Sequence, residues 1–368
     1  MKIKAAVVQE VGAPFVIRDV ELAEPRENDV LVKIHACGVC HTDAVTRDGL
    51  IPMAFPAILG HEGAGVVEKV GSAVKTIKPG DHVVMTQNFC GVCESCISGH
   101  PMSCNHVGEY NFAGTYPDGQ KRVKDENGAE IASFFSQSSF ATHAITHVNN
   151  TIVIDRDFDL GLAAPFGCGV QTGAGAVINV FRPKAGQSIA VFGCGGVGLS
   201  AIMAAKLSGC LEIIAVDIVD ERLALAEELG ATRTINGKKV NGIADEIMRY
   251  TKGRGTDFSL ECSGTPALVN EALNCLCQRG TAGIVGSLGD KDVTSKLMDT
   301  LMRHGRRLVG ILEGDSVPQL FIPTLIGLCK KGLFPVEKLV TYYDFNDIEK
   351  AFADAGRGAV VKPVLLMD

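Results

Sequence analysis

The pattern of apolar and polar positions divides most of the chain into two regions. Residues 1–150 contain short runs in which apolar and polar residues alternate, separated by turns rich in Gly and Pro, which is typical of β-strands. Residues 183–312 alternate short apolar runs with segments of helical spacing, such as residues 219–230. Strands that alternate with helices predict a parallel, doubly wound sheet. The chain is therefore expected to be an α/β protein with one doubly wound domain and one mostly β domain.

The end of the chain adds two helical patterns and a last strand. The helices are predicted over residues 317–332 and 345–358, and the strand over residues 360–367. Residues 160–181 carry no charge and are long enough to span a bilayer. Their glycines, proline and polar side chains favour a buried helix and loop instead, so we expect no membrane span.

Composition narrows the class of protein. The 368 residues include 35 Lys and Arg against 42 Asp and Glu, which gives a net charge of −7. The chain has no run of basic residues, and this argues against a nucleic-acid partner. The N-terminus lacks the apolar run of a signal peptide, which predicts a cytoplasmic protein. In that reducing compartment, 13 cysteines are expected to be thiols, metal ligands or core residues rather than disulfides.

Four of the cysteines lie close together in residues 89–104. Their spacing fits a metal site or a disulfide knot, and the reducing compartment favours the metal. Four thiolates complete a tetrahedral zinc shell and leave no position for water or substrate, so such a site stabilises a loop. The segment has no Lys or Arg, which argues against a nucleic-acid-binding zinc finger. The four residues are Cys90, Cys93, Cys96 and Cys104.

A glycine motif follows the first predicted strand of the doubly wound region. Gly193 allows a tight turn, Gly195 lets a pyrophosphate approach the backbone, and Gly198 lets the next helix pack closely on the strand. The following strand ends at Asp217, where an acid accepts hydrogen bonds from the adenosine ribose and repels a 2′-phosphate. The motif predicts a dinucleotide site that prefers NAD to NADP.

Several motifs together resemble those of the zinc-dependent medium-chain alcohol dehydrogenases. They are GVCHTD, GHEGAGVV, the four-cysteine segment, FGCGVQTGAG and VFGCGGVGL, and the resemblance covers essentially the whole chain. Residues 167–180 and 321–340 most resemble the aryl (benzyl) alcohol dehydrogenases. The resemblance implies a GroES-like, zinc-binding catalytic domain over residues 1–172 and 313–368. It implies an NAD-binding Rossmann domain over residues 173–312.

The resemblance also implies two zinc ions per chain. Cys40, His61 and Cys168 match the ligands of a catalytic zinc, and three protein ligands leave a fourth tetrahedral position open. The four-cysteine segment matches a structural zinc site. Glu62 matches a carboxylate that can transiently coordinate the catalytic metal, and Asp43 matches the residue that orients His61.

Further roles follow from the resemblance, position by position. Thr42 matches the hydroxyl residue that takes the alcohol proton, whereas Val45 stands where many members have a histidine that ends a proton relay. His41 is a possible substitute for that histidine. The residues assigned to the cofactor are Gly193, Gly195, Gly196, Val197, Gly198, Asp217, Arg222, His41, Lys362 and Val285. The residues assigned to the substrate pocket are Ile51, Thr86, Phe134 and Phe135, although Phe134 and Phe135 could equally be ordinary core residues.

The reaction expected from the resemblance is hydride transfer from a primary alcohol to NAD+, which yields an aldehyde. Two adjacent phenylalanines could stack on an aryl substrate. The alternatives are an aliphatic alcohol, S-(hydroxymethyl)glutathione, or no reaction at all in a structural relative. The first two need the same zinc, and a structural relative would be expected to lose zinc ligands that this chain keeps. A homo-oligomer, either a dimer or a tetramer, is expected as well.

Overall fold

The computed structural model describes residues 1–367, which form two compact units. The first unit contains residues 1–168, 317–332 and those from 336 onward, and the second contains residues 169–316 and 333–335. These boundaries differ by a few residues from the predicted ones. The difference arises because helix α5 (Gly169–Gly175) packs on α6 (Gly196–Leu207) of the second unit.

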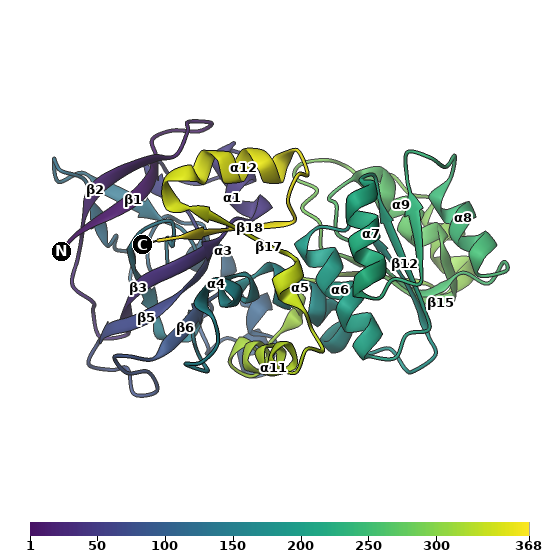
Figure 1. The fold of residues 1–368 in the computed structure, drawn as a ribbon, viewed down its shortest axis with the longest axis horizontal. Coiled ribbons are helices and arrows are strands. Elements are labelled where there is room, and N and C mark those ends of the chain that lie inside the picture. The colour runs from purple at the N-terminus through teal and green to yellow at the C-terminus, as the bar shows by residue number, and fades with distance from the viewer. Residues whose placement is uncertain (368) are drawn as a thin grey trace. The chain divides into compact units, whose positions relative to one another are not determined.

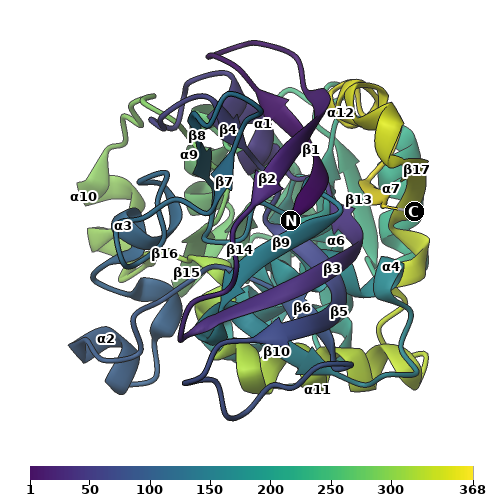
Figure 2. The same cartoon turned by 90° about the vertical axis from the view of Figure 1, so that its left-hand side faces the viewer.

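The first unit is mostly β and contains a closed barrel and a separate sheet (Figure 2). The barrel strands, in spatial order, are β1 (Lys2–Val8), β2 (Val16–Leu22), β7 (Val123–Lys124), β8 (Glu130–Ser133) and β4 (Ala57–Ile58). The sheet strands, in spatial order, are β10 (Thr151–Ile154), β6 (His82–Met85), β5 (Glu62–Val70), β3 (Asp29–Gly38), β18 (Lys362–Leu366) and β17 (Val340–Asp344), with β9 (His143–His147) also paired with β3.

The end of the chain belongs to this first unit. Strand β18 pairs antiparallel with β3, so the last strand lies beside one of the first. The two predicted C-terminal helices are confirmed as α11 (Pro318–Lys330) and α12 (Ile348–Gly356). The other helices of the unit are short: α1 (His41–Arg47), α2 (Glu94–Ile97), α3 (Val107–Asn111) and α4 (Leu160–Ala163).

The second unit confirms the predicted doubly wound sheet. Its strands run in the order β13 (Arg233–Asn236), β12 (Glu212–Asp217), β11 (Ser188–Phe192), β14 (Thr256–Glu261), β15 (Leu276–Ile284) and β16 (Arg307–Gly310), and each neighbouring pair is parallel. Its helices besides α5 and α6 are α7 (Asp220–Leu229), α8 (Ile243–Tyr250), α9 (Pro266–Asn274) and α10 (Leu297–Thr300) (Figure 1). The strand order reverses between β11 and β14, and dinucleotides bind at such a point.

The uncharged stretch at residues 160–181 forms short buried helices, as predicted. Its last part is a π-helix, Ala176–Phe181, that continues α5. Among residues 1–367, no helix is both long and apolar enough to cross a membrane.

Candidate functional site

Four metal-binding side chains converge in the first unit. One ligand atom from each of Cys40, His61, Glu62 and Cys168 lies within 4.8 Å of the other three. Cys40 is the N-cap of α1, and Glu62 is the first residue of β5, directly after His61. The chain thus brings together residues that are far apart in sequence, as the resemblance implied.

The His61 ring is held in one orientation by Asp43. Nδ1 of His61 lies 3.0 Å from Oδ1 of Asp43, and the backbone N–H of Gly60 donates to the same oxygen at 3.0 Å. The other carboxylate oxygen accepts from the backbone N–H of Cys40 at 3.2 Å. Because Asp43 accepts from Nδ1–H, Nε2 is the ring nitrogen that remains for a metal ion.

The Nε2 atom of His61 gives a direct test of whether the site fits a metal. It is buried and has no hydrogen-bond partner among residues 1–367. Buried polar atoms are nearly always satisfied, and a zinc ion between this nitrogen and the two thiolates would satisfy it. The residues present therefore fit a zinc ion.

The thiol chemistry of the cluster agrees with this. A hydrogen bond with Cys168 lowers the pKa of Cys40 well below its usual range, although burial opposes the charge, and His61 adds to the effect. Metals bind the thiolate rather than the thiol, so a lowered pKa prepares the site for a cation. The hydroxyl of Thr42 lies 3.7 Å from Sγ of Cys40, close to the metal position.

Glu62 forms a buried ion pair with Lys362. Nζ of Lys362 donates to its two carboxylate oxygens at 2.9 and 3.0 Å, and to the carbonyl of Val39 at 3.2 Å. Both side chains are buried. Burial opposes the charge of Lys362, but Glu62 raises the pKa of Lys362 above its usual range. The structure places the Lys362 ammonium on Glu62, and the assignment of Lys362 to the cofactor stays a prediction.

Two phenylalanine rings contact His61, and a third packs against them. Phe135 stacks on the imidazole with ring centroids 4.6 Å apart, and Phe134 meets it edge-on at 5.5 Å. Both are almost fully buried. Phe112 packs edge-on against both of them, at 5.2 Å from Phe135 and 5.9 Å from Phe134, and is only half-buried. The sequence analysis missed Phe112, because it follows a short helix in a segment without periodicity.

The other residues assigned to the substrate pocket and the proton path differ in how deeply they are buried. The Thr86 hydroxyl is fully buried and donates to the carbonyl of Gly167 at 2.6 Å. Ile51 is half-buried, and Val45 is buried on α1. His41, the first residue of α1, is exposed.

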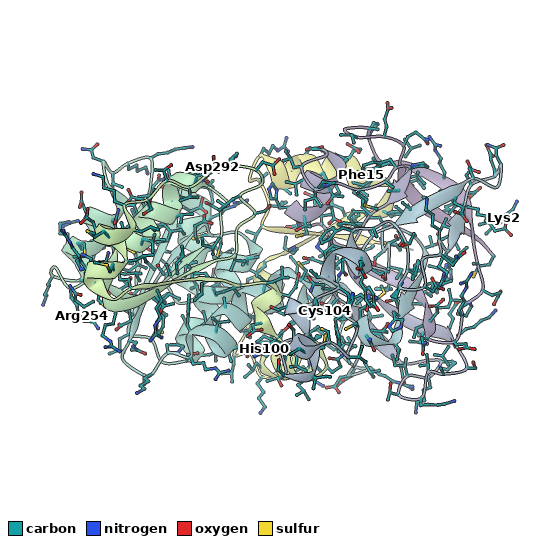
Figure 3. The ribbon with its side chains drawn as sticks, turned by 180° about the vertical axis from the view of Figure 1, so that it is seen from behind. Lys2, Phe15, His100, Cys104, Arg254 and Asp292 are labelled. Carbon is teal, nitrogen blue, oxygen red and sulfur yellow. The ribbon has the colours of Figure 1, made fainter. Side chains whose placement is uncertain are left out.

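The four-cysteine segment forms a second cluster of metal-binding type. Sulfur–sulfur distances are 3.5 Å for Cys93–Cys96 and 3.9 Å for both Cys90–Cys96 and Cys93–Cys104. A tetrahedral zinc with Zn–S bonds of about 2.3 Å sets its sulfurs roughly 3.8 Å apart, so the cluster has the size of a zinc tetrathiolate. All four are free cysteines, which excludes a disulfide knot in this structure. Figure 3 labels Cys104 and the nearby His100.

Backbone N–H groups support negative charge on these sulfurs. Cys90 accepts from Val92 and Cys93 at 3.4 and 3.2 Å. Hydrogen bonds from the backbone of Asn105 and Cys96 lower the pKa of Cys93 to about 6, whereas burial raises the pKa of Cys96 to about 12. A bound cation would favour the thiolate at all four positions, and the energy of binding would fold this loop.

The glycine motif of the second unit forms a tight turn between β11 and α6. Gly193 has φ +95°, a conformation that favours glycine. A Cβ on Gly198 would lie 1.8 Å from the carbonyl oxygen of Gly193, so the helix can approach the strand only without one. Gly195, the N-cap of α6, has open space where its Cβ would be. These features agree with the expected tasks of the three glycines, which are a tight turn, room for a pyrophosphate and close packing of the helix on the strand.

Asp217 lies where the ribose-binding acid was predicted, at the end of β12. One of its oxygens accepts from the backbone N–H of Cys194 at 2.6 Å, and the other accepts from Ile218 and Val219. Its carboxylate thus also fixes the glycine turn. Arg222 lies in the first turns of α7 and Val285 directly follows β15, whereas Gly196 and Val197 begin α6.

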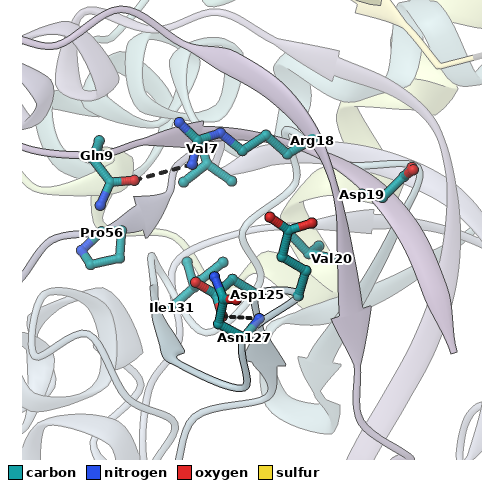
Figure 4. Close-up of a pocket in the computed structure, with 10 residues that line it drawn as sticks. Val7, Gln9, Arg18, Asp19, Val20, Pro56, Asp125, Asn127 and Ile131 are labelled. Atoms are coloured by element: carbon teal, nitrogen blue, oxygen red, sulfur yellow. Dashed lines mark hydrogen bonds between the residues drawn. The ribbon is translucent and has the colours of Figure 1, made fainter.

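A cavity of about 270 Å³ lies on the barrel and contains none of the predicted site residues (Figure 4). Arg18 donates to Gln9 at 3.3 Å within it, and the backbone N–H of Asn127 donates to Asp125 at 2.9 Å. Two pairs of its polar groups thus bond to one another, and we assign the cavity no role.

Comparisons with known proteins agree with this geometry. A family profile described as an alcohol dehydrogenase GroES-like domain matches residues 26–148, and one described as a zinc-binding dehydrogenase matches residues 196–330. A geraniol dehydrogenase of Castellaniella defragrans is 41% identical over 365 residues, 99% of this chain and 97% of that protein. The crystal structure of a benzyl alcohol dehydrogenase from Acinetobacter calcoaceticus has a TM-score of 0.96 and 38% identity, and covers 100% of both chains.

A third relative is an alcohol dehydrogenase zinc-binding domain protein from Burkholderia ambifaria, with a TM-score of 0.97 and 46% identity over 100% of this chain and 99% of that one. The chain belongs to the zinc-binding medium-chain alcohol dehydrogenase family. It is a zinc-dependent alcohol dehydrogenase.

Proposed function

We propose that this dehydrogenase oxidises a primary aryl alcohol of the benzyl type with NAD+ to the aldehyde. The observation that carries the zinc chemistry of this proposal is the Nε2 of buried His61, which has no hydrogen-bond partner among residues 1–367 and lies beside two thiols, of which Cys40 has a lowered pKa. Cys40, His61 and Cys168 would hold the catalytic zinc. Zinc supplies Lewis acidity, which lets an alcohol ionise near neutral pH.

The residues of the chain have distinct tasks in this proposal. Asp43 keeps Nδ1 of His61 protonated, so that Nε2 remains available for the metal. Thr42, 3.7 Å from Sγ of Cys40, accepts the proton of the alcohol and passes it on. Val45 cannot carry a proton further, so its exit depends on the exposed His41 or on water.

The choice of NAD rests on Asp217. A carboxylate at the end of β12 accepts hydrogen bonds from ribose hydroxyls and repels a 2′-phosphate. When bound, the nicotinamide supplies the hydride acceptor, while the chain supplies position and exclusion of water. Exchange of this acid would therefore alter cofactor choice without altering the zinc ligands.

The aryl substrate is supported by the rings beside His61. Phe112, half-buried, packs edge-on against Phe135, which itself stacks on His61, and aromatic pairs prefer such edge or offset contacts. The similarity to a benzyl alcohol dehydrogenase points the same way. The similarity to a geraniol dehydrogenase makes an allylic primary alcohol the second candidate, because it too has a π system beside the carbinol carbon.

The test is a rate assay on protein that carries its zinc. NADH or NADPH formation is followed with benzyl alcohol, cinnamyl alcohol, geraniol, ethanol and S-(hydroxymethyl)glutathione. We expect kcat/KM for benzyl alcohol to exceed that for ethanol by at least about tenfold, since the ring buries far more apolar surface. NAD+ should be preferred to NADP+. Equal rates with ethanol and benzyl alcohol would overturn the aryl assignment.

A further inference from the structure

We infer that Glu261 is a positioning residue for the dinucleotide. Its buried carboxylate fixes the turn that follows β14, and this turn packs against the glycine turn after β11, where the pyrophosphate would bind. The inference rests on the proposed use of NAD. It concerns a residue that resembles an ordinary core position at the end of a strand.

Glu261 stands at the point where the strand order reverses. It is the last residue of β14, and it pairs in register with Phe192, the last residue of β11. Dinucleotides cross a doubly wound sheet at the carboxyl ends of these two strands. The side chain is nevertheless completely buried, which is costly for a carboxylate unless its oxygens accept hydrogen bonds.

The donors that satisfy this carboxylate all come from the turn that follows it. One oxygen accepts from the backbone N–H of Ser263 at 2.8 Å and from the Ser263 hydroxyl. The other accepts from the backbone N–H of Gly264 at 3.2 Å. The main-chain carbonyl of Glu261 accepts from Val285 and Gly286 at 2.9 and 3.0 Å, which ties in the end of β15. A single residue thus fixes two neighbouring loops.

The fixed turn touches the glycine turn directly. A Cβ built on Gly193 would lie 3.3 Å from both the backbone nitrogen and the Cβ of Ser263. A Cβ on Gly286 would lie 2.6 Å from the carboxylate of Glu261, and one on Gly264 would lie 2.2 Å from the carbonyl oxygen of Ser287. The loops are packed backbone to backbone, so a shift of the Ser263 turn would be passed on to Gly193.

Glu261→Gln is the sharpest change, because it keeps the shape and replaces one acceptor oxygen by a donor. The new NH2 group would face backbone N–H groups that already donate. The turn must then move, and the glycine turn loses its support. We expect the Kd for NADH and for ADP-ribose to rise about tenfold, with KM for NAD+ raised far more than KM for the alcohol.

The chain offers a matched control on the same strand. Asp257, near the other end of β14, accepts from the backbone N–H and hydroxyl of Ser188 at 2.9 and 2.7 Å. Asp257→Asn is the same change of acid to amide in the same sheet. It lies at the edge of the sheet opposite the carboxyl ends of the strands, away from the predicted dinucleotide site. It should lower the melting temperature while leaving the Kd for NADH unchanged.

The experiment titrates NADH and ADP-ribose into the zinc-containing full-length protein and its variants, with melting temperatures measured in parallel. Weakened binding in Glu261→Gln but not in Asp257→Asn supports the inference. Binding as tight as that of the wild type in Glu261→Gln, or equal weakening in both variants, overturns it. Failure of the wild type to bind NADH would overturn the proposed function instead.

If Glu261→Gln does not fold, Ser263→Ala gives the same test in a milder form. It removes one of the donors to the carboxylate and keeps the charge. We expect the Kd for NADH to rise by roughly two- to fivefold. An unchanged Kd for NADH in Ser263→Ala would contradict the inference.

Discussion

Nζ of Lys362 lies 2.9 Å from Oε1 of Glu62, so the C-terminal strand β18 places a cation on the carboxylate that directly follows His61. Both side chains are buried, and removal of one partner from such a pair costs about 3–5 kcal/mol, because the other charge is left without a partner. The pair therefore links the last strand of the chain to the metal site.

Lys362→Met should destabilise the first unit by roughly that amount, measured by urea unfolding of the zinc-containing protein. The double variant Lys362→Met with Glu62→Gln should recover part of the loss, since a buried amide needs no cation. If Lys362→Met were as stable as the wild type, the ion pair would contribute nothing to the free energy of unfolding.

Asp43→Asn should weaken zinc binding at the catalytic site. An amide in place of the carboxylate no longer fixes Nδ1–H of His61, and loss of such a partner lowers metal affinity about 10–100-fold. Competition with a chelator measures the affinity. Asp48→Asn, at the exposed C-cap of the same helix, is the control and should retain wild-type affinity.

Cys104→Ser should lower the melting temperature before it affects the chemical step. Three thiolates and a hydroxyl bind zinc less tightly, and we expect the melting temperature to fall by about 5 °C or more. Cys329→Ser, on α11, should melt like the wild type. Lost turnover in Cys104→Ser with an unchanged melting temperature would place the four-cysteine site in catalysis and contradict its structural role.

Phe112→Leu should shift substrate choice. The ratio of kcat/KM for benzyl alcohol to that for 1-hexanol is expected to fall by roughly 2–10-fold, the worth of one aromatic contact. Phe258→Leu is the control, because it replaces a half-buried ring that stacks on Phe181 in the second unit. An unchanged ratio in Phe112→Leu would remove this ring from the substrate pocket.

The sequence predicted those parts of the site that depend on short, local patterns. Gly193, Gly195 and Gly198 lie within one short turn, where Gly193 has a positive φ and Gly198 packs against the carbonyl of Gly193, and the four-cysteine segment lies within one loop. The spacing of apolar and polar residues along the chain also predicted the doubly wound sheet and the helices α11 and α12. Each of these features is specified by neighbouring residues, so the sequence displays it.

Contacts between distant residues could not be predicted in this way. Glu62 and Lys362 are 300 positions apart, so no local pattern indicates that they form an ion pair. Glu261 ends a strand of mixed polar and apolar residues, and only the fold shows that its carboxylate closes the next turn. Phe112 joins the ring cluster through tertiary packing alone. The zinc ligands Cys40, His61 and Cys168 share this property and were assigned only through the family resemblance.

We expect the chemistry to occur at Cys40, His61 and Cys168, and the four-cysteine site to be structural. The most direct measurement compares turnover of benzyl alcohol with NAD+, and zinc content, in wild type and Cys40→Ser. The account predicts about two zinc ions per wild-type chain and about one in the variant. It predicts a loss of turnover of at least about a thousandfold with little change in melting temperature. Undiminished turnover in Cys40→Ser would contradict the account.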